Sequence, residues 1–317
     1  MQSLYTSFRL LSTVTLLAGA LLWTGCDSNN SNMEESPSRI SYDLAAQSND
    51  GAIPEGVDGT VTFWALGSSQ TLVTLELDDG ATGASVSHPA HIHNNSASEG
   101  GEIAVYLTAI DGSGGGGTSA RIVNQPIDTF TDFDGYVNIH ESVANLGTVV
   151  SQGNIGANAE GNEGDGLSLV DSPRTTSYSL SANANGGDVA PDGVPGTVLF
   201  QELTDELTLV TLSLDIDGAT GANVSHPAHI HNNSASEGGG IEYYLSPIDG
   251  SDSAARSSKI VDAPYDTLVG FDGYVNVHES VANLGTVVSQ GNIGANVDGS
   301  GSRSEERRVG KECIVKC

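Results

Sequence analysis

All eight histidines of the chain fall into two matching sets. The first set is His88, His91, His93 and His140, and the second is His226, His229, His231 and His278. Each member of the second set lies 138 residues after its counterpart. Both sets contain a His-x-His sequence, and neutral imidazole is a good ligand for copper, zinc and nickel. The two sets are therefore candidate metal sites.

The histidines belong to an internal duplication. Residues 88–101 recur unchanged at 226–239, and residues 135–140 recur at 273–278 with one change, Ile139 to Val277. The segment 59–63 matches 196–200 at an offset one residue shorter. Each copy has about 120 residues, a normal length for one domain. We predict two tandem domains, residues 38–158 and 175–297, joined by a linker at 159–174.

The local pattern of each copy is typical of β-strands. Runs rich in Val, Ile, Thr, Leu and Tyr, such as 59–65, 71–77, 102–107 and 136–140, are separated by clusters of Gly, Asn, Asp and Ser. No stretch has the apolar spacing of an amphipathic helix over three turns. The pattern predicts an all-β fold in which each copy is an antiparallel sandwich or a Greek-key barrel, and we take two tandem antiparallel Greek-key β-sandwiches as the prediction.

Strand alternation predicts which way the histidines face. Successive side chains of a strand point to opposite faces, so His91 and His93 share one face and Ile92 takes the other. His140 likewise lies opposite its aliphatic neighbours at 137 and 139. If the aliphatic residues fill the core, the histidines project from the outer face of the sheet and are not buried packing residues.

Three motifs in order resemble the CHRD domain, first described in chordin and frequent in bacterial secreted proteins. They are Ala90-His-Ile-His93, Gly101-Glu-Ile-Ala-Val-Tyr-Leu107 and Tyr136-Val-Asn-Ile-His140-Glu-Ser-Val-Ala-Asn145. The match covers most of both copies. It implies an immunoglobulin-like β-sandwich or barrel, in a family whose biochemical function is generally unassigned. Residues 147–153 depart from the family's Gly-Glu-Ile-Arg-Gly segment, so the family's Arg is absent here.

A weaker resemblance is to copper-zinc superoxide dismutase, a Greek-key barrel that binds copper through a His-x-His and further histidines. The resemblance implies one site per domain, made by His91, His93 and His140 and by His229, His231 and His278. It implies copper or zinc as the ion, one per domain. The zinc-loop histidines of the dismutase are missing, which puts redox catalysis in doubt. We expect His88 and His226 to lie in turns or to support the other histidines.

The first 25 residues have the features of a lipoprotein signal peptide. Arg9 precedes an apolar run from Leu10 to Trp23, which ends in Thr24-Gly25-Cys26. The run is shorter than the roughly 20 residues that span a bilayer. The sequence before Cys26 resembles a bacterial lipobox, although Trp23 stands where Leu is usual. The resemblance implies cleavage before Cys26, a lipid on its sulfur, and a polar tether at 26–37. A plain secretory signal is the alternative.

The C-terminal segment differs abruptly from the rest of the chain. Residues 303–313 are similar to the translation of a common sequencing adapter, so we interpret the tail at 298–317 as an artefact from residue 303 onward. A genuine basic tail is the alternative. The interpretation removes Cys313 and Cys317 and leaves Cys26 as the lipid acceptor. Neither domain then offers a disulfide or a thiol nucleophile.

The chain is strongly acidic, with a net charge of −29. Between residues 27 and 302 the basic side chains are Arg39, Arg121, Arg174, Arg256 and Lys259, against 37 Asp and Glu. Nucleic acid is excluded as a partner, since no cationic patch is available to neutralise phosphates. An acidic surface suits solubility in high salt or attraction of cations.

These observations predict a non-enzymatic binding protein that is lipid-anchored in the cell envelope, on the periplasmic or cell-surface side. The first alternative is a structural or adhesive module in which the histidines only hydrogen-bond loops and steady the turns at Asn94-Asn95 and Asn145. A copper-dependent, dismutase-like enzyme is the second alternative. No Gly-x-Ser-x-Gly elbow is present to support a serine hydrolase. The sequence identifies no protein partner beyond the membrane.

Overall fold

The computed structural model describes residues 37–78, 86–112, 117–215, 224–250, 252, 254–297 and 304–305, and these belong to one compact unit. The predicted signal peptide, Cys26, the tether up to residue 36 and nearly all of the tail lie outside the described residues. Within the described residues, no helix is long and apolar enough to cross a membrane.

The first copy, called repeat 1, contains eleven strands and one helical turn among its described residues. They are β1 (Arg39–Ala46), β2 (Gly59–Leu66), β3 (Gln70–Leu77), β4 (Ser87–His88), β5 (Ala90–Asn94), β6 (Ile103–Tyr106), β7 (Ile110–Asp111), β8 (Thr118–Val123), α1 (Asp128–Thr131), β9 (Asp134–Ser142), β10 (Asn145–Gly156) and β11 (Asn162–Gly164).

The second copy, called repeat 2, follows the same order. Its elements are β12 (Thr175–Ala182), β13 (Gly196–Glu202), β14 (Thr208–Leu214), β15 (Ser225–Asn232), β16 (Ile241–Asp249), β17 (Arg256–Val261), α2 (Tyr265–Val269), β18 (Asp272–Ser280), β19 (Asn283–Gly294) and β20 (Ser304–Glu305).

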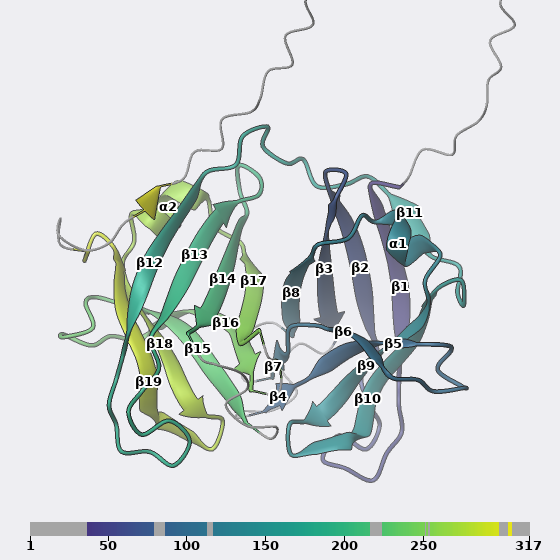
Figure 1. The fold of residues 1–317 in the computed structure, drawn as a ribbon, viewed down its shortest axis with the longest axis horizontal. Coiled ribbons are helices and arrows are strands. Elements are labelled where there is room, and N and C mark those ends of the chain that lie inside the picture. Colours follow the sequence, from purple (N-terminus) through teal and green to yellow (C-terminus); the bar gives the residue numbers. More distant parts are fainter. Residues whose placement is uncertain are drawn as a thin grey trace, which may run out of the picture. The chain divides into compact units, whose positions relative to one another are not determined.

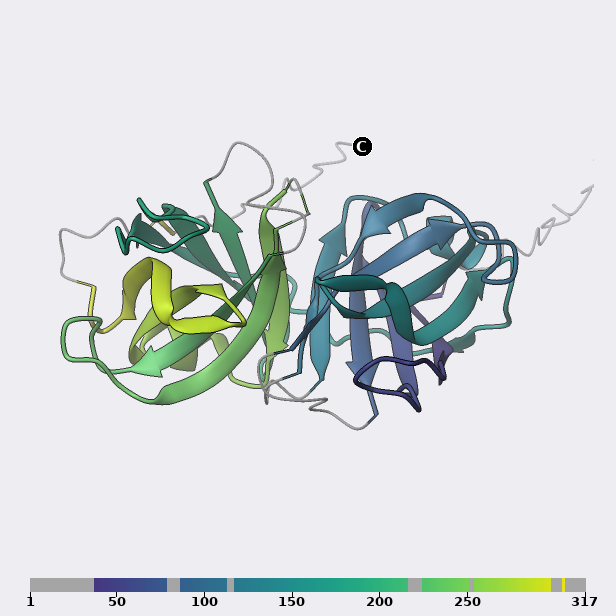
Figure 2. The ribbon, with the colours of Figure 1, turned by 90° about the horizontal axis from the view of Figure 1, so that it is seen from below.

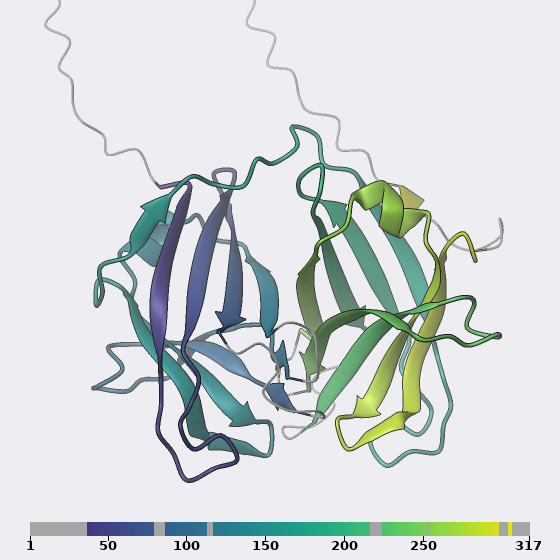
Figure 3. The ribbon, with the colours of Figure 1, turned by 180° about the vertical axis from the view of Figure 1, so that it is seen from behind.

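Each repeat is built mainly from two antiparallel sheets, and in repeat 1 β4 and β7 form a further antiparallel pair. In repeat 1 one sheet has the order β11-β1-β2-β3-β8 and the other β6-β5-β9-β10, and the end of β1 also pairs with β10. In repeat 2 the corresponding orders are β20-β12-β13-β14-β17 and β16-β15-β18-β19. The two sheets of each repeat can be followed in Figure 1, and from below and from behind in Figures 2 and 3.

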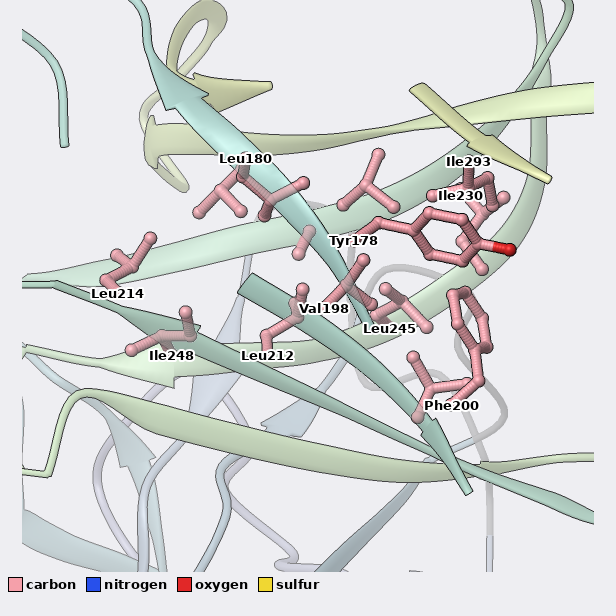
Figure 4. Close-up of a cluster of buried hydrophobic side chains, with 14 of the residues drawn as sticks. Tyr178, Leu180, Val198, Phe200, Leu212, Leu214, Ile230, Leu245, Ile248 and Ile293 are labelled. Atoms are coloured by element: carbon pink, nitrogen blue, oxygen red, sulfur yellow. The ribbon is translucent and has the colours of Figure 1, made fainter. Parts of the chain in front are cut away.

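Each repeat has its own hydrophobic cluster between its sheets. In repeat 2, Tyr178, Val198 and Phe200 from one sheet meet Ile230 and Ile293 from the other (Figure 4). Residues two apart on β13 share the inward face, as strand geometry requires. A third, smaller cluster contains residues of both repeats.

The all-β prediction is confirmed, since the described residues are mostly antiparallel sheet with two short helices. The expected strands at 59–65, 71–77 and 136–140 correspond to β2, β3 and part of β9. The Greek-key topology and the division into two domains stay predictions.

A core substitution in repeat 2 should show that its cluster stabilises the fold. Phe200 is fully buried and its ring makes an edge contact with Tyr178, at 5.7 Å between centroids. We expect Phe200→Ala to lower the free energy of unfolding by about 3–5 kcal/mol, because it removes a large buried ring and leaves a cavity. Thr197 is exposed on the same strand, and Thr197→Ala should change the value by less than about 0.5 kcal/mol. Equal effects in urea denaturation would contradict this account.

Candidate metal centre

Two adjacent strands position the three histidines of repeat 1. β5 and β9 run antiparallel without interruption, and His91 lies opposite Asn138 while His93 lies opposite Tyr136. The Pro89 carbonyl accepts the His140 N–H at 2.8 Å, which extends the pairing to His140. The alternate residues of these strands, Ile92 among them, are fully buried in the core.

Register shifts occur in the strands that flank this pair. The β5–β6 ladder shifts between Ile92 and His93, and the β9–β10 ladder shifts on either side of Val149, the residue opposite His140. A bulge bends a strand and re-aims its side chains. The irregularities therefore occur at the positions where two of the three imidazoles must turn toward one another.

The structure brings His91, His93 and His140 together, with one ring nitrogen from each within 4.8 Å of the others. His91 Nδ1 and His140 Nε2 are 3.1 Å apart. Two nitrogens bound to one tetrahedral ion at about 2.0–2.1 Å lie about 3.3 Å from each other. The distance therefore suits shared binding of an ion as well as an N–H···N hydrogen bond.

His93 is held by its other nitrogen. Its Nδ1 lies 2.9 Å from the Gly101 carbonyl oxygen, and its ring stacks on Tyr136 with centroids 4.9 Å apart. A carbonyl oxygen only accepts, so Nδ1 must carry the proton and Nε2 must present a lone pair. The Gly101 N–H in turn donates to the Tyr136 hydroxyl oxygen at 3.2 Å. A side chain at Gly101 would collide with the Asn94 carbonyl, so this close turn requires glycine.

The histidines lie on the sheet face opposite the core, as alternation predicts, but they are buried there. His91 is 3%, His93 9% and His140 6% exposed. The expectation that they are not buried was wrong, because aromatic residues cover the outer face. Tyr106 of β6 makes an edge contact with His91 at 4.9 Å between centroids, and Tyr136 covers His93.

Burial and repulsion by neighbouring histidines keep the His91 and His140 rings neutral. Burial, followed by the neighbouring His140 and His93, lowers the pKa of His91 to about 3. Burial, together with His93, lowers the pKa of His140 to about 4, although the Leu146 backbone opposes the shift. Neutral imidazole is the form that binds a metal ion. At neutral pH both rings therefore have a nitrogen lone pair available.

The second site repeats this arrangement in detail. Ring nitrogens of His229, His231 and His278 lie within 4.8 Å of one another, and His229 Nδ1 is 3.1 Å from His278 Nε2. His231 Nδ1 lies 3.1 Å from the Gly239 carbonyl, and its ring stacks on Tyr274 at 4.9 Å. Burial and the other two histidines lower the pKa of His229 to about 3.

The fourth histidine of each set stands apart from the three. His88, fully buried in β4, has its Nδ1 2.9 Å from the His140 carbonyl oxygen, and His226 has the same relation to His278 at 3.0 Å. Both therefore contact the backbone of a neighbouring histidine. Sequence reasoning placed them in turns or supporting positions but did not identify this contact.

Several buried ring nitrogens of these histidines have no hydrogen-bond partner. Among the described residues these include Nε2 of His91, His93 and His231. A buried polar atom without a partner costs about 1–3 kcal/mol relative to a satisfied one. Three imidazole lone pairs at this spacing suit copper, zinc or nickel and leave calcium and magnesium unsuited, because those ions prefer oxygen ligands.

Comparisons with known proteins found no similar protein. No protein-family model matches the chain, and none of the curated proteins or solved structures compared with it is significantly similar. The likeness to the CHRD domain stays a prediction from the sequence motifs.

The lowered pKa values give a testable dependence of stability on pH in the metal-free protein. The unfolded histidines have a pKa of about 6.5, so below that pH the unfolded chain binds more protons than the folded chain. The stabilisation is complete above pH 6.5 and is lost as the pH falls toward the folded values near 3–4. From pH 7 to pH 5 we expect a loss of about 1–2 kcal/mol for each such ring.

Urea denaturation in EDTA at pH 7 and pH 5 measures this loss. The double variant His91→Gln with His229→Gln provides the control, because it keeps all the carboxylates and removes one lowered ring from each site. Its free energy of unfolding should fall less between the two pH values than that of the unchanged chain. Equal slopes would show that the rings are not held neutral by the fold.

Proposed function

We propose that the protein binds two transition-metal ions, copper or zinc, one at each three-histidine site. The observation that carries this proposal is the state of His93. Its Nδ1–H is committed to the Gly101 carbonyl, so its Nε2 lone pair is directed toward His91 and His140. Metal-bound histidines in proteins commonly donate the other ring N–H to a backbone carbonyl in this way, which fixes the tautomer and the ring orientation.

The purely structural alternative accounts for only half of these contacts. Steadying the turn at Asn94-Asn95 requires the Nδ1 bond of His93 to Gly101, and it leaves His93 Nε2 and His91 Nε2 buried without partners. An apolar side chain at either position would avoid that unfavourable burial. An ion bound by His93 Nε2, together with His91 and His140, satisfies the buried lone pair of His93, so metal binding is the better explanation of three convergent imidazoles.

We further propose that this binding protein is a lipoprotein with two CHRD-like domains, attached to the cell envelope through Cys26. The support is the sequence pattern before Cys26 and the order of the three motifs in each copy. The net charge of −29 favours accumulation of cations near the surface, which would assist capture of a metal ion. Binding, without turnover, is the proposed activity.

Metal analysis of the purified, lipid-free protein tests the proposal. After loading at pH 7 and removal of excess ion, we expect about two equivalents of copper or zinc by mass spectrometry. His91→Ala with His93→Ala should halve the content, because it destroys one site and leaves the other. His229→Ala with His231→Ala should halve it as well, and all four changes together should abolish it.

The duplication supplies the control for misfolding. An ion that binds only the folded state raises the melting temperature. A double variant that still binds one equivalent of metal, and is still stabilised by it against heat, must therefore have folded the repeat that was not changed. Metal content no higher than that of the fourfold variant would overturn the proposal and leave the structural or adhesive role. Superoxide turnover by the copper-loaded protein would instead favour the dismutase-like alternative.

A further inference from the structure

The two repeats meet along an approximate two-fold axis. β8 of repeat 1 pairs antiparallel with β17 of repeat 2 at Ala120 and Ser258. These residues are each other's counterparts in the duplication, 138 positions apart. The hydroxyls of Ser87 and Ser225, another pair of counterparts, lie 2.7 Å apart and are buried. A residue that contacts its own counterpart marks the axis of a symmetric interface.

Each repeat places one cation on this face at the same position, whereas the carboxylates that face the two cations are not each other's counterparts. Arg121 of repeat 1 makes an ion pair with Asp252 of repeat 2, at 2.6 Å between Nη1 and Oδ2. Lys259, the counterpart of Arg121, is buried and interacts electrostatically with Asp111 of repeat 1. Each repeat thus contributes one cation at the same position, and a carboxylate of the other repeat faces it.

Part of the apolar contact is also composed of counterparts. The third hydrophobic cluster contains Leu72 with Leu209, Leu66 with Leu203 and Ile122 with Ile260. Members of these pairs are separated by 137 or 138 residues, as the duplication requires. The same surface of each repeat therefore enters the contact.

Two cavities flank the axis at equivalent places. One, of 330 Å³, is lined by residues that include Thr60, Trp64 and Thr118. The other, of 360 Å³, is lined by their counterparts Thr197, Gln201 and Arg256. The two cavities lie at equivalent positions, but some of the side chains that line them differ, since Trp64 corresponds to Gln201 and Thr118 to Arg256.

We propose that this face, formed by β4, β7, β8 and the adjoining end of β3 and by the equivalent strands of repeat 2, is a self-complementary dimerisation surface. The partner that it fits is a second copy of the same repeat. In this chain the surface of each repeat is covered by the other repeat. The protein is therefore a pseudo-dimer whose two halves belong to one polypeptide.

Because these charged groups are largely buried, they affect how β8 of repeat 1 aligns with β17 of repeat 2. Buried ion pairs add little net stability, but a cation left without its carboxylate is strongly unfavourable. A shift of β8 along β17 would separate Arg121 from Asp252 while the leucines still found apolar surface. The apolar cluster therefore supplies attraction, and the Arg121–Asp252 ion pair favours the register in which Ala120 pairs with Ser258.

Engineered cysteines in the full chain test the closed arrangement. With Cys26, Cys313 and Cys317 replaced by serine, Ser87→Cys with Ser225→Cys should form a disulfide within the chain under mild oxidation. We expect most molecules to show the link on a non-reducing gel and by peptide mapping. Ser98→Cys with Ser236→Cys is the matched control, because these exposed counterparts are also 138 residues apart and no contact joins them in the described residues.

Free thiols at 87 and 225, a link formed only between chains, or equal linkage in the control pair would each overturn the proposal. A charge-reversal cycle gives a second measurement that does not depend on cysteine geometry. Arg121→Asp and Asp252→Arg should each lower the melting temperature, and the double variant should recover most of the loss. Additive losses in the double variant would contradict the assigned pairing. Metal content near two equivalents in these variants would show that the metal sites are independent of this face.

Discussion

The positions of the histidines depend on the burial of the aliphatic residues between them. Ile92 in β5 and Val137 and Ile139 in β9 are fully buried in the core of repeat 1. Since side chains alternate along a strand, locking these residues inward fixes His91, His93 and His140 on the opposite face. A one-residue slip in β5 or β9 would reverse both faces at once. The hydrophobic core therefore determines the register that assembles the site.

A second layer of contacts turns a row of outward histidines into an enclosed site. The Gly101 carbonyl selects the tautomer of His93, and Tyr136 both stacks on that ring and accepts the Gly101 N–H. Enclosure removes water from the imidazoles and so disfavours their charged forms. The same cover that lowers the pKa of His91 to about 3 also leaves its Nε2 without a hydrogen-bond partner. The neutral form of the ring and its unpartnered nitrogen thus have one cause.

The fold class and the pairing of His91 with His93 followed from local pattern. Alternation around Ile92 and the recurrence of residues 88–101 were sufficient to predict strands and two equivalent His-x-His pairs, and the resemblance to the dismutase added His140 and His278 to them. Burial of the rings could not be predicted in the same way, because the cover comes from Tyr106 on a neighbouring strand and from the loop that ends at Gly101. These contacts depend on which strands become neighbours and on the register shift after Ile92, and neither leaves a periodic signal in the sequence.

The differences between the two repeats are informative about what the duplication constrains. Every contact of a metal site is made within one repeat, and the segment 88–101 is identical to 226–239. Contacts across the axis join two different positions in one chain, and there Trp64 has become Gln201 and Arg121 has become Lys259. In a dimer of identical copies, one substitution would change both halves of the interface at once. In one chain that contains both repeats, a substitution changes only one half of the contact. The contact face can therefore differ between the repeats, while each three-histidine site keeps the same residues because its geometry is set within one repeat.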